Sequence, residues 1–315
     1  MTDAAVTDAA VTDAAVTDVR NVPVRRQGPG EAAFPPLASD RTTTWVVACD
    51  LDQTLIFSRR SFRLGEGVAE PPLVTVEHLD GEPAAFMTEA AFASVAELAG
   101  RAVLVPVTTR TLGQYRRVRL GVTPAYAVAA NGGHLLVDGE PDPAWAATVA
   151  GRLRAGAPLA DLLAVAERLA VGGWCRLTRV ADDLFIYLVA HDREGIPDLT
   201  EVTAEVEAAG WTVSVQGRKV YLVPAALTKQ AALAEVARRA GADRVAAAGD
   251  SLLDAPMLLA ADTAVRPAHG ELHDRAWTAP HLHVTAAPGL LAGEELLAHL
   301  TGIVAGPPAL PVAHL

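Results

Sequence analysis

Residues 45–54 read WVVACDLDQT, in which an apolar run is followed at once by two carboxylates that flank a leucine. A short apolar run that ends in polar residues is typical of a strand buried on both faces of a parallel sheet. Similar runs occupy residues 102–107, 126–130 and 244–248. Helical stretches at 88–99 and 229–240 are each followed by a glycine, a common helix stop. Strands that alternate with helices in this way predict an α/β fold with a parallel sheet.

The pattern changes between residues 131 and 224. Strands separated by turns are expected at 174–180, 184–190, 211–215 and 220–223, and helices at 144–170, broken near Gly156, and at 198–209. A hairpin is expected at 73–87, with Asp80 and Gly81 at its turn. We therefore predict a Rossmann-like core domain over 42–130 and 225–303, with an inserted α+β cap domain over 131–224.

The two ends of the chain are expected to lie outside these domains. Residues 1–41 contain three copies of TDAAV and then a stretch rich in proline and glycine, a composition that supplies no core to fold around. We predict a disordered tail over 1–41 and a flexible C-terminal tail over 304–315.

The composition restricts the classes of partner. With 37 acidic and 26 basic residues, the chain has a formal net charge of −11. This charge argues against binding to nucleic acid, which needs a positive surface, and against docking on anionic membranes. No stretch reaches the roughly 18 apolar residues that a membrane span needs. The N-terminus also lacks the basic and apolar segments of a secretory signal, so a cytoplasmic location is expected.

Four polar segments are expected to meet at one edge of the predicted sheet, because each comes directly after a core strand or opens a helix. They are residues 50–54, residues 108–110, Lys229 and residues 249–254. Ligands of open α/β sheets bind at the carboxyl ends of the strands. Each segment alone is compatible with a turn or a solvated side chain. Together they supply carboxylates, a hydroxyl and an ammonium, a set whose mutual repulsion a bound cation and the lysine would offset.

The order of these segments resembles that of the haloacid dehalogenase superfamily, in which residues 50–55, DLDQTL, are similar to the first motif DxDx(T/V)L. The resemblance implies that Asp50 attacks phosphorus and becomes an aspartyl-phosphate. It also implies that Asp52 acts as general acid and then general base. Thr108 matches the residue that hydrogen-bonds the phosphoryl group, and Lys229 matches the lysine that neutralises it.

The resemblance extends to a Mg²⁺ site. The segment at 249–254 reads GDSLLD and is similar to the fourth motif GDSxxD, whose acidic residues hold the metal. The implied ligand set is Asp50, Leu51 through its backbone carbonyl, Asp52, Asp250 and Asp254. Mg²⁺ takes hard oxygen ligands of this kind and keeps several waters, which Asp254 could contact in place of the ion.

The position of the insertion resembles that of the Cof-type and sucrose-phosphate-phosphatase-like branch, because the predicted cap lies between Thr108 and Lys229. The sequence Asn131-Gly132-Gly133 is similar to that branch's core-to-cap junction. Thr109 stands where the branch commonly has glycine, so either Thr108 or Thr109 faces the phosphate, and we favour Thr108. The expected substrate-binding residues are Thr109, Arg110, Asn131, Arg218 and Lys219.

These features predict a Mg²⁺-dependent phosphatase that hydrolyses a small phosphorylated metabolite, a sugar phosphate or a similar phosphomonoester. A phosphomutase, which would share Asp50 and Asp52, remains an alternative, as does a non-catalytic module that binds phosphometabolites. The histidines of the C-terminal region, such as His269, are assigned to surface or capping roles. The basic segment 115–119 is assigned to a solvated helix face.

Overall fold

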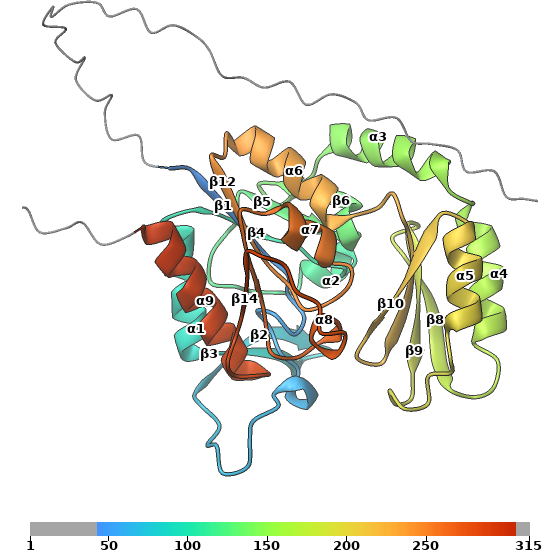
Figure 1. Cartoon of the computed structure of the whole chain (residues 1–315), viewed down its shortest axis with the longest axis horizontal. Helices are drawn as coiled ribbons and strands as arrows, with labels where there is room; N and C mark the ends of the chain where they lie inside the picture. Colours follow the sequence, from blue (N-terminus) through green and yellow to red (C-terminus); the bar gives the residue numbers. More distant parts are fainter. Residues whose placement is uncertain (1–42, 307–315) are drawn as a thin grey trace, which may run out of the picture. The chain divides into compact units, whose positions relative to one another are not determined.

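The central sheet matches the predicted parallel arrangement. In the computed structural model, which describes residues 43–306, its strands are β1 (Trp45–Cys49), β4 (Val103–Pro106), β12 (Arg244–Ala248), β13 (Thr263–Arg266) and β14 (Leu282–Val284). They lie in the order β14-β13-β12-β1-β4, and every neighbouring pair is parallel (Figure 1). The α/β fold class is therefore confirmed. The predicted tail at 1–41 lies outside the described residues.

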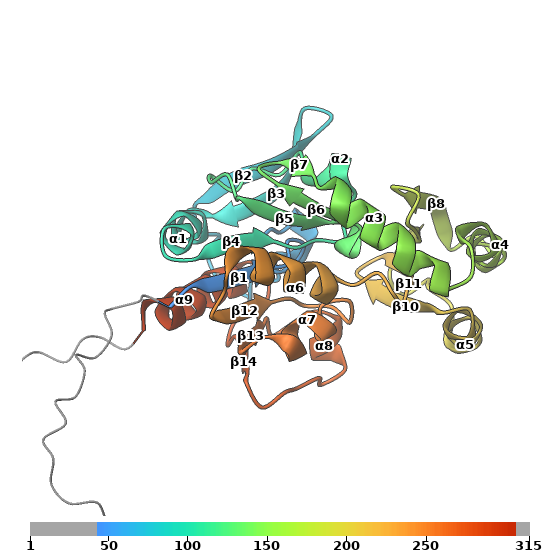
Figure 2. The same ribbon diagram turned by 90° about the horizontal axis from the view of Figure 1, so that it is seen from above.

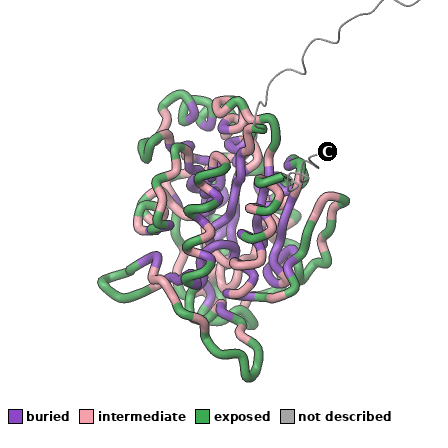
Figure 3. Tube along the Cα trace, turned by 90° about the vertical axis from the view of Figure 1, so that its left-hand side faces the viewer, coloured by how far each residue is buried: buried purple, intermediate pink, exposed green. Residues whose placement is uncertain are grey.

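Helices cover both faces of this sheet, as the apolar strands require. Val46 and Ala48 pack in one apolar cluster with α6 (Lys229–Ala240) and α7 (Ala255–Ala260). Val47 and Cys49 of β1 pack in a second apolar cluster with α1 (Glu89–Ala99) and α9 (Leu290–Ala305). The strands at the centre are consequently buried along their length (Figure 3). Since α9 continues to Ala305, the predicted start of the C-terminal tail at 304 is slightly too early.

Two smaller sheets extend the core. The predicted hairpin is present as β2 (Leu73–Leu79) and β3 (Glu82–Thr88). In contrast, β5 (Tyr126–Ala129) is not a strand of the parallel sheet. It pairs antiparallel with β6 (His134–Val137), which pairs with β7 (Glu140–Pro141). The backbone hydrogen bonds of β5 are therefore made mainly with a hairpin partner close in sequence. A single parallel bridge between Val107 and Val128 links this small sheet to the segment after β4.

The boundary of the cap also differs from the prediction at 131. Because β6 and β7 pair with β5, they belong with the core, as does α3 (Pro143–Arg152). Trp145 of α3 donates from its indole to the Gly132 carbonyl at 2.8 Å, and Asp142 at the helix start pairs with Arg239 of α6. The cap region, defined as the four-stranded antiparallel sheet with its helices, thus begins after the short helix η3 (Leu153–Ala155).

The cap itself is an antiparallel sheet with two helices on one face (Figures 1 and 2). Its strands β8 (Cys175–Ala181), β9 (Phe185–Ala190), β10 (Trp211–Gln216) and β11 (Lys219–Pro224) lie in the order β10-β11-β9-β8. The helices are α4 (Leu159–Leu169) and α5 (Thr200–Ala208). Ser214 of β10 reaches the core, where its hydroxyl donates to Glu271 of α8 (Glu271–Asp274) at 2.8 Å. No helix within residues 43–306 is long and apolar enough to cross a membrane.

Candidate active site

Three neighbouring strands bring the predicted site residues to one edge of the sheet. Asp50 follows β1, Thr108 follows β4 and Asp250 follows β12, and these strands are adjacent and parallel. The backbone N–H of Asp50 still donates to the Ala248 carbonyl at 2.9 Å, so the first carboxylate is held in register with the strand beside it. Lys229 enters from the first turn of α6, whose start is capped by the Thr228 hydroxyl.

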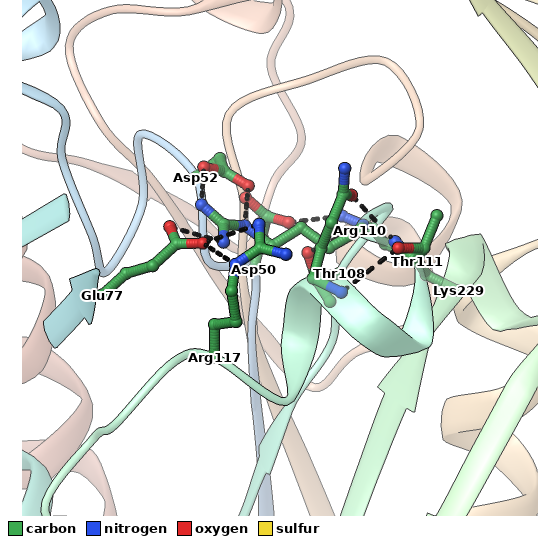
Figure 4. A network of polar contacts seen from close by, with 9 residues as sticks. Asp50, Asp52, Glu77, Thr108, Arg110, Thr111, Arg117 and Lys229 are labelled. Carbon is green, nitrogen blue, oxygen red and sulfur yellow. Dashed lines mark hydrogen bonds and ion pairs between the residues drawn. The ribbon is translucent and has the colours of Figure 1, made fainter. Parts of the chain in front are cut away.

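Lys229 joins two of these carboxylates inside the protein. Its ammonium donates to Oδ1 of Asp50 at 2.6 Å (Figure 4). It also donates to Oδ1 of Asp254 at 2.6 Å. The lysine side chain is 1% exposed, so this is a buried, charge-assisted pair of hydrogen bonds. Burial opposes the charge on Lys229, but Asp254 and Asp50 outweigh this effect and raise its pKa. The ammonium is therefore charged throughout the physiological range.

The carboxylates of this cluster are not fully compensated by Lys229. Burial raises the pKa of Asp50, the Lys229 charge partly lowers it, and the nearby Asp254 raises it again, to about 7. The pKa of Asp250 lies well above its usual range, because of burial and then of the charges on Asp50 and Asp254. Three buried carboxylates near one ammonium repel one another, and a further cation beside them would stabilise their ionised forms.

The donor atoms fit a hard divalent cation. Oxygens of Asp50, Asp250 and Asp254 lie within 4.8 Å of one another. Within residues 43–306, neither Oδ2 of Asp50 nor either carboxylate oxygen of Asp250 accepts a hydrogen bond, so these atoms are free to act as ligands. Asp254 differs, because its Oδ2 accepts from the Ser251 N–H at 3.0 Å and the Ser251 hydroxyl at 2.7 Å. Asp254 therefore holds the Lys229 ammonium in place and stabilises the turn over residues 251–254.

The predicted carbonyl ligand needs correction. The Leu51 carbonyl accepts backbone hydrogen bonds from the three N–H groups of Thr54, Leu55 and Ile56, at 3.2, 2.9 and 2.8 Å. These bonds close the turn that follows β1 and occupy the oxygen. Leu51 is therefore removed from the ligand set, although its side chain is buried in the core as expected.

Asp52 has a different partner from Asp50. Arg110 donates to both carboxylate oxygens of Asp52, through Nε at 2.7 Å and Nη2 at 2.8 Å (Figure 4). The Asp52 side chain is 48% exposed and borders a cavity. Desolvation opposes ionisation, but the Arg110 charge and hydrogen bonds prevail and lower the pKa of Asp52 to about 2. Asp52 is thus ionised in this arrangement. Because Arg110 occupies both oxygens, the carboxylate of Asp52 is also removed from the predicted ligand set.

Sequence reasoning missed the residue that holds Arg110. Glu77 of β2 is buried, accepts from Nη1 of Arg110 at 2.7 Å and also accepts from Arg117 at 3.0 Å (Figure 4). Arg117 was predicted to lie on a solvated helix face, but α2 (Leu112–Tyr115) ends before it and its guanidinium turns to Glu77. The only signal in the sequence was an acidic residue within a strand of mostly apolar residues, LVTVEHL.

Both candidate threonines border the space beside Asp50. A small cavity of about 10 Å³, the space for one water, is lined by Asp50, Asp52, Thr108 and Thr109. The Thr108 hydroxyl oxygen accepts from the Arg110 N–H at 3.2 Å. The Thr109 hydroxyl is buried with no hydrogen-bond partner among the described residues. Either hydroxyl is thus placed to donate to a bound oxyanion, and that of Thr109 has no competing bond.

The predicted cap residues divide into two groups. Arg218 and Lys219 line a cavity of about 350 Å³ that Asp52 also borders. Asn131 does not line either cavity: its buried side chain donates to the Leu227 carbonyl at 2.7 Å. Its backbone has φ of 55°, the left-handed conformation that asparagine tolerates. The structure therefore does not place Asn131 at either cavity, and its Nδ2 braces the junction between core and cap while its buried Oδ1 has no hydrogen-bond partner among the described residues.

His269 is buried, so of the surface or capping roles predicted for it the surface role is wrong, and its ring bonds to backbone groups instead. Its Nδ1 accepts from the Gly289 N–H at 2.8 Å, which leaves the proton on Nε2, and Nε2 donates to the Gln53 carbonyl at 2.8 Å. Burial lowers the pKa of His269 to about 4, so the ring is neutral. His269 consequently fixes the backbone immediately after Asp52.

Comparison with solved structures finds the same overall fold in a sucrose-phosphatase and in two further bacterial or archaeal proteins, each less than 25% identical to this chain. The sucrose-phosphatase of Synechocystis sp. PCC6803, solved with sucrose and phosphate, has a TM-score of 0.57 and 16% identity, and the match covers 82% of this chain and 98% of that one. A protein of Streptococcus mutans UA159 has a TM-score of 0.52 and 12% identity, with 84% and 100% covered. A Thermoplasma acidophilum protein has a TM-score of 0.51 and 13% identity, with 82% and 98% covered. No family model and no curated protein matches the sequence.

Proposed function

We propose that this protein is a Mg²⁺-dependent phosphatase that hydrolyses a small phosphomonoester through an aspartyl-phosphate on Asp50. The observation that carries the proposal is the buried cluster in which Lys229 contacts Asp50 and Asp254 at 2.6 Å each, with Asp250 beside them. A structural ion pair would need only one carboxylate for one ammonium. The surplus of buried carboxylates matches a site that binds a cation and an oxyanion together.

The first step uses Asp50 as the nucleophile. One oxygen of its carboxylate forms a bond to phosphorus while the bond from phosphorus to the ester oxygen breaks, and Lys229, which donates to Oδ1 at 2.6 Å, orients the carboxylate. The Lys229 ammonium and the threonine hydroxyls of the small cavity stabilise the charge that spreads over the phosphoryl oxygens. A Mg²⁺ ion bound by Asp50 and Asp250 would add positive charge at the same oxygens.

The second step uses Asp52 as a base. In the described arrangement Arg110 keeps Asp52 ionised, which suits the removal of a proton from the water that attacks the aspartyl-phosphate. Phosphate then leaves and Asp50 is restored. To protonate the departing ester oxygen in the first step, Asp52 must carry a proton. We infer that the substrate draws Arg110 away from Asp52, since a phosphoryl group is an alternative partner for a guanidinium.

A screen of the purified protein against a panel of phosphorylated metabolites, with and without Mg²⁺, tests this proposal. Release of inorganic phosphate that requires Mg²⁺ and disappears in the Asp50→Asn variant supports it. Transfer of the phosphoryl group to a second position of the substrate, without net release, would favour a mutase. Absence of turnover on every ester would count against an enzyme of this class.

A further inference from the structure

The cavity beside Asp52 has a strongly positive lining. It has a volume of about 350 Å³ and lies between the turn that follows β1 and the cap strands β9, β10 and β11. Among the described residues that line it, Asp52 is the one acidic side chain, and Arg110 already neutralises that carboxylate. Five basic side chains line the cavity: Arg60, Arg63, Arg193, Arg218 and Lys219.

Most of these cations lack a counter-charge. Arg193 pairs with Asp274 at 2.9 Å, but the other four make no ion pair within residues 43–306. Arg63 donates only to the neutral Gln53 amide at 3.3 Å, and Arg218 donates only to the His191 carbonyl at 3.0 Å. Such a concentration of uncompensated positive charge stands out in a chain whose net charge is −11.

The placement of this charge indicates what it binds. Like charges that face one cavity repel each other, and a concave wall focuses their field, so the cavity favours an anion. Asp52, Lys219 and Tyr221 border both this cavity and the small cavity at Asp50, so the two cavities lie side by side. The phosphoryl group under transfer is placed at Asp50 and Lys229 by the proposed mechanism. The arginines are therefore left for the other end of the substrate.

Resting on the proposed phosphatase function, we infer that the leaving group of the substrate carries a second anionic group, a carboxylate or a phosphate, bound by Arg60, Arg63 and Arg218. Arginine suits this role, because its planar fork binds carboxylate and phosphate oxygens in pairs. A simple neutral sugar phosphate would leave these arginines without an anionic partner.

Matched esters test this inference with the full-length protein and Mg²⁺. Phosphoglycerate is compared with glycerol phosphate, and phosphogluconate with sorbitol phosphate, so that each pair differs only in a carboxylate against a hydroxymethyl group. A hexose bisphosphate and its monophosphate form the pair for a second phosphate. We expect kcat/KM to favour the anionic member of at least one pair by about tenfold or more. A ratio near one in every pair would overturn the inference.

Variants assign the preference to the arginines. Arg60→Gln and Arg63→Gln should each reduce the ratio of kcat/KM between anionic and neutral esters by about fivefold or more. Arg59→Gln is the matched control, because Arg59 belongs to the same short helix η1 (Arg59–Ser61) but pairs with Glu70 and does not line the cavity. A ratio that is unchanged in both variants, or that falls equally in Arg59→Gln, would contradict the assignment.

Calorimetry separates this inference from the proposed function. The Asp50→Asn variant with Mg²⁺ is titrated with the same matched esters, so that binding is measured without turnover. If the wild type hydrolyses no ester, the phosphatase proposal fails, while tighter binding of the anionic esters would still support the second anion site. Equal binding of both members of every pair would contradict it.

Discussion

Replacing Lys229 by methionine removes the ammonium that both Asp50 and Asp254 contact, while a side chain of similar length stays in place. Two charge-assisted hydrogen bonds of 2.6 Å are lost, and the lysine is 1% exposed, so solvent cannot replace them. Breaking a buried ion pair by removing one partner costs about 3–5 kcal/mol. We expect a loss of this size in the free energy of unfolding without Mg²⁺, measured by urea denaturation near pH 8.

The loss should depend on pH. The pKa of Asp50 is already raised to about 7 in the folded wild type, and without the Lys229 charge it rises further. A carboxyl whose folded pKa is raised binds more protons folded than unfolded, so its contribution to stability decreases as pH rises. Protonation relieves the uncompensated charge at low pH. The difference in stability between wild type and Lys229→Met should therefore shrink as pH falls from about 8 toward 5.

Lys219→Met is the control, since Lys219 is the chain's other lysine and makes no ion pair within the described residues. It should lose less than about 1 kcal/mol. A loss below about 1 kcal/mol for Lys229→Met near pH 8, or a loss that does not change with pH, would refute the reasoning.

Other positions give independent tests. Glu77→Gln weakens the support of Arg110 and should lower kcat about tenfold in steady-state assays, whereas wild-type turnover would make Glu77 irrelevant to the site. Asp250→Asn should raise the Mg²⁺ concentration for half-maximal activity about tenfold or more, and an unchanged Mg²⁺ titration would exclude it as a ligand. Gly270→Ala should lower the melting temperature, because a Cβ there would lie 2.5 Å from Oδ2 of Asp250 and φ is 88°. Gly302→Ala, which meets nothing within 4 Å, should not lower it.

The sequence is most informative where function and fold depend on the same local pattern. Asp50 and Thr108 follow an apolar run directly and Asp250 follows one after a single glycine, so the predicted strand ends are enough to locate them. The cap strands are recognisable because Asp182, Asp183 and Gly217 mark the turns of the two hairpins, β8–β9 and β10–β11. Even the break near Gly156 in the helical segment corresponds to the division between α3 and α4.

The errors arise where pairing is decided by residues far apart or by backbone geometry. The apolar run at 126–130 is buried as predicted, but only one parallel bridge links it to the segment after β4, and its regular partner is the antiparallel β6. Glu77 reaches Arg110 across 33 positions of sequence, through a strand whose register shifts beside it. His269 and Asn131 are polar residues that bond to backbone groups, a role with no periodic signature.

Acid-quenched peptide mapping of the protein during turnover tests the central claim most directly. Substrate and Mg²⁺ are mixed with the wild type and with Asp50→Asn, and the quenched peptides are analysed by mass spectrometry. We expect one phosphoryl group on the peptide that contains Asp50 in the wild type, and neither label nor phosphate release in Asp50→Asn. Phosphate release at the wild-type rate by Asp50→Asn, or a label on another residue, would contradict the account.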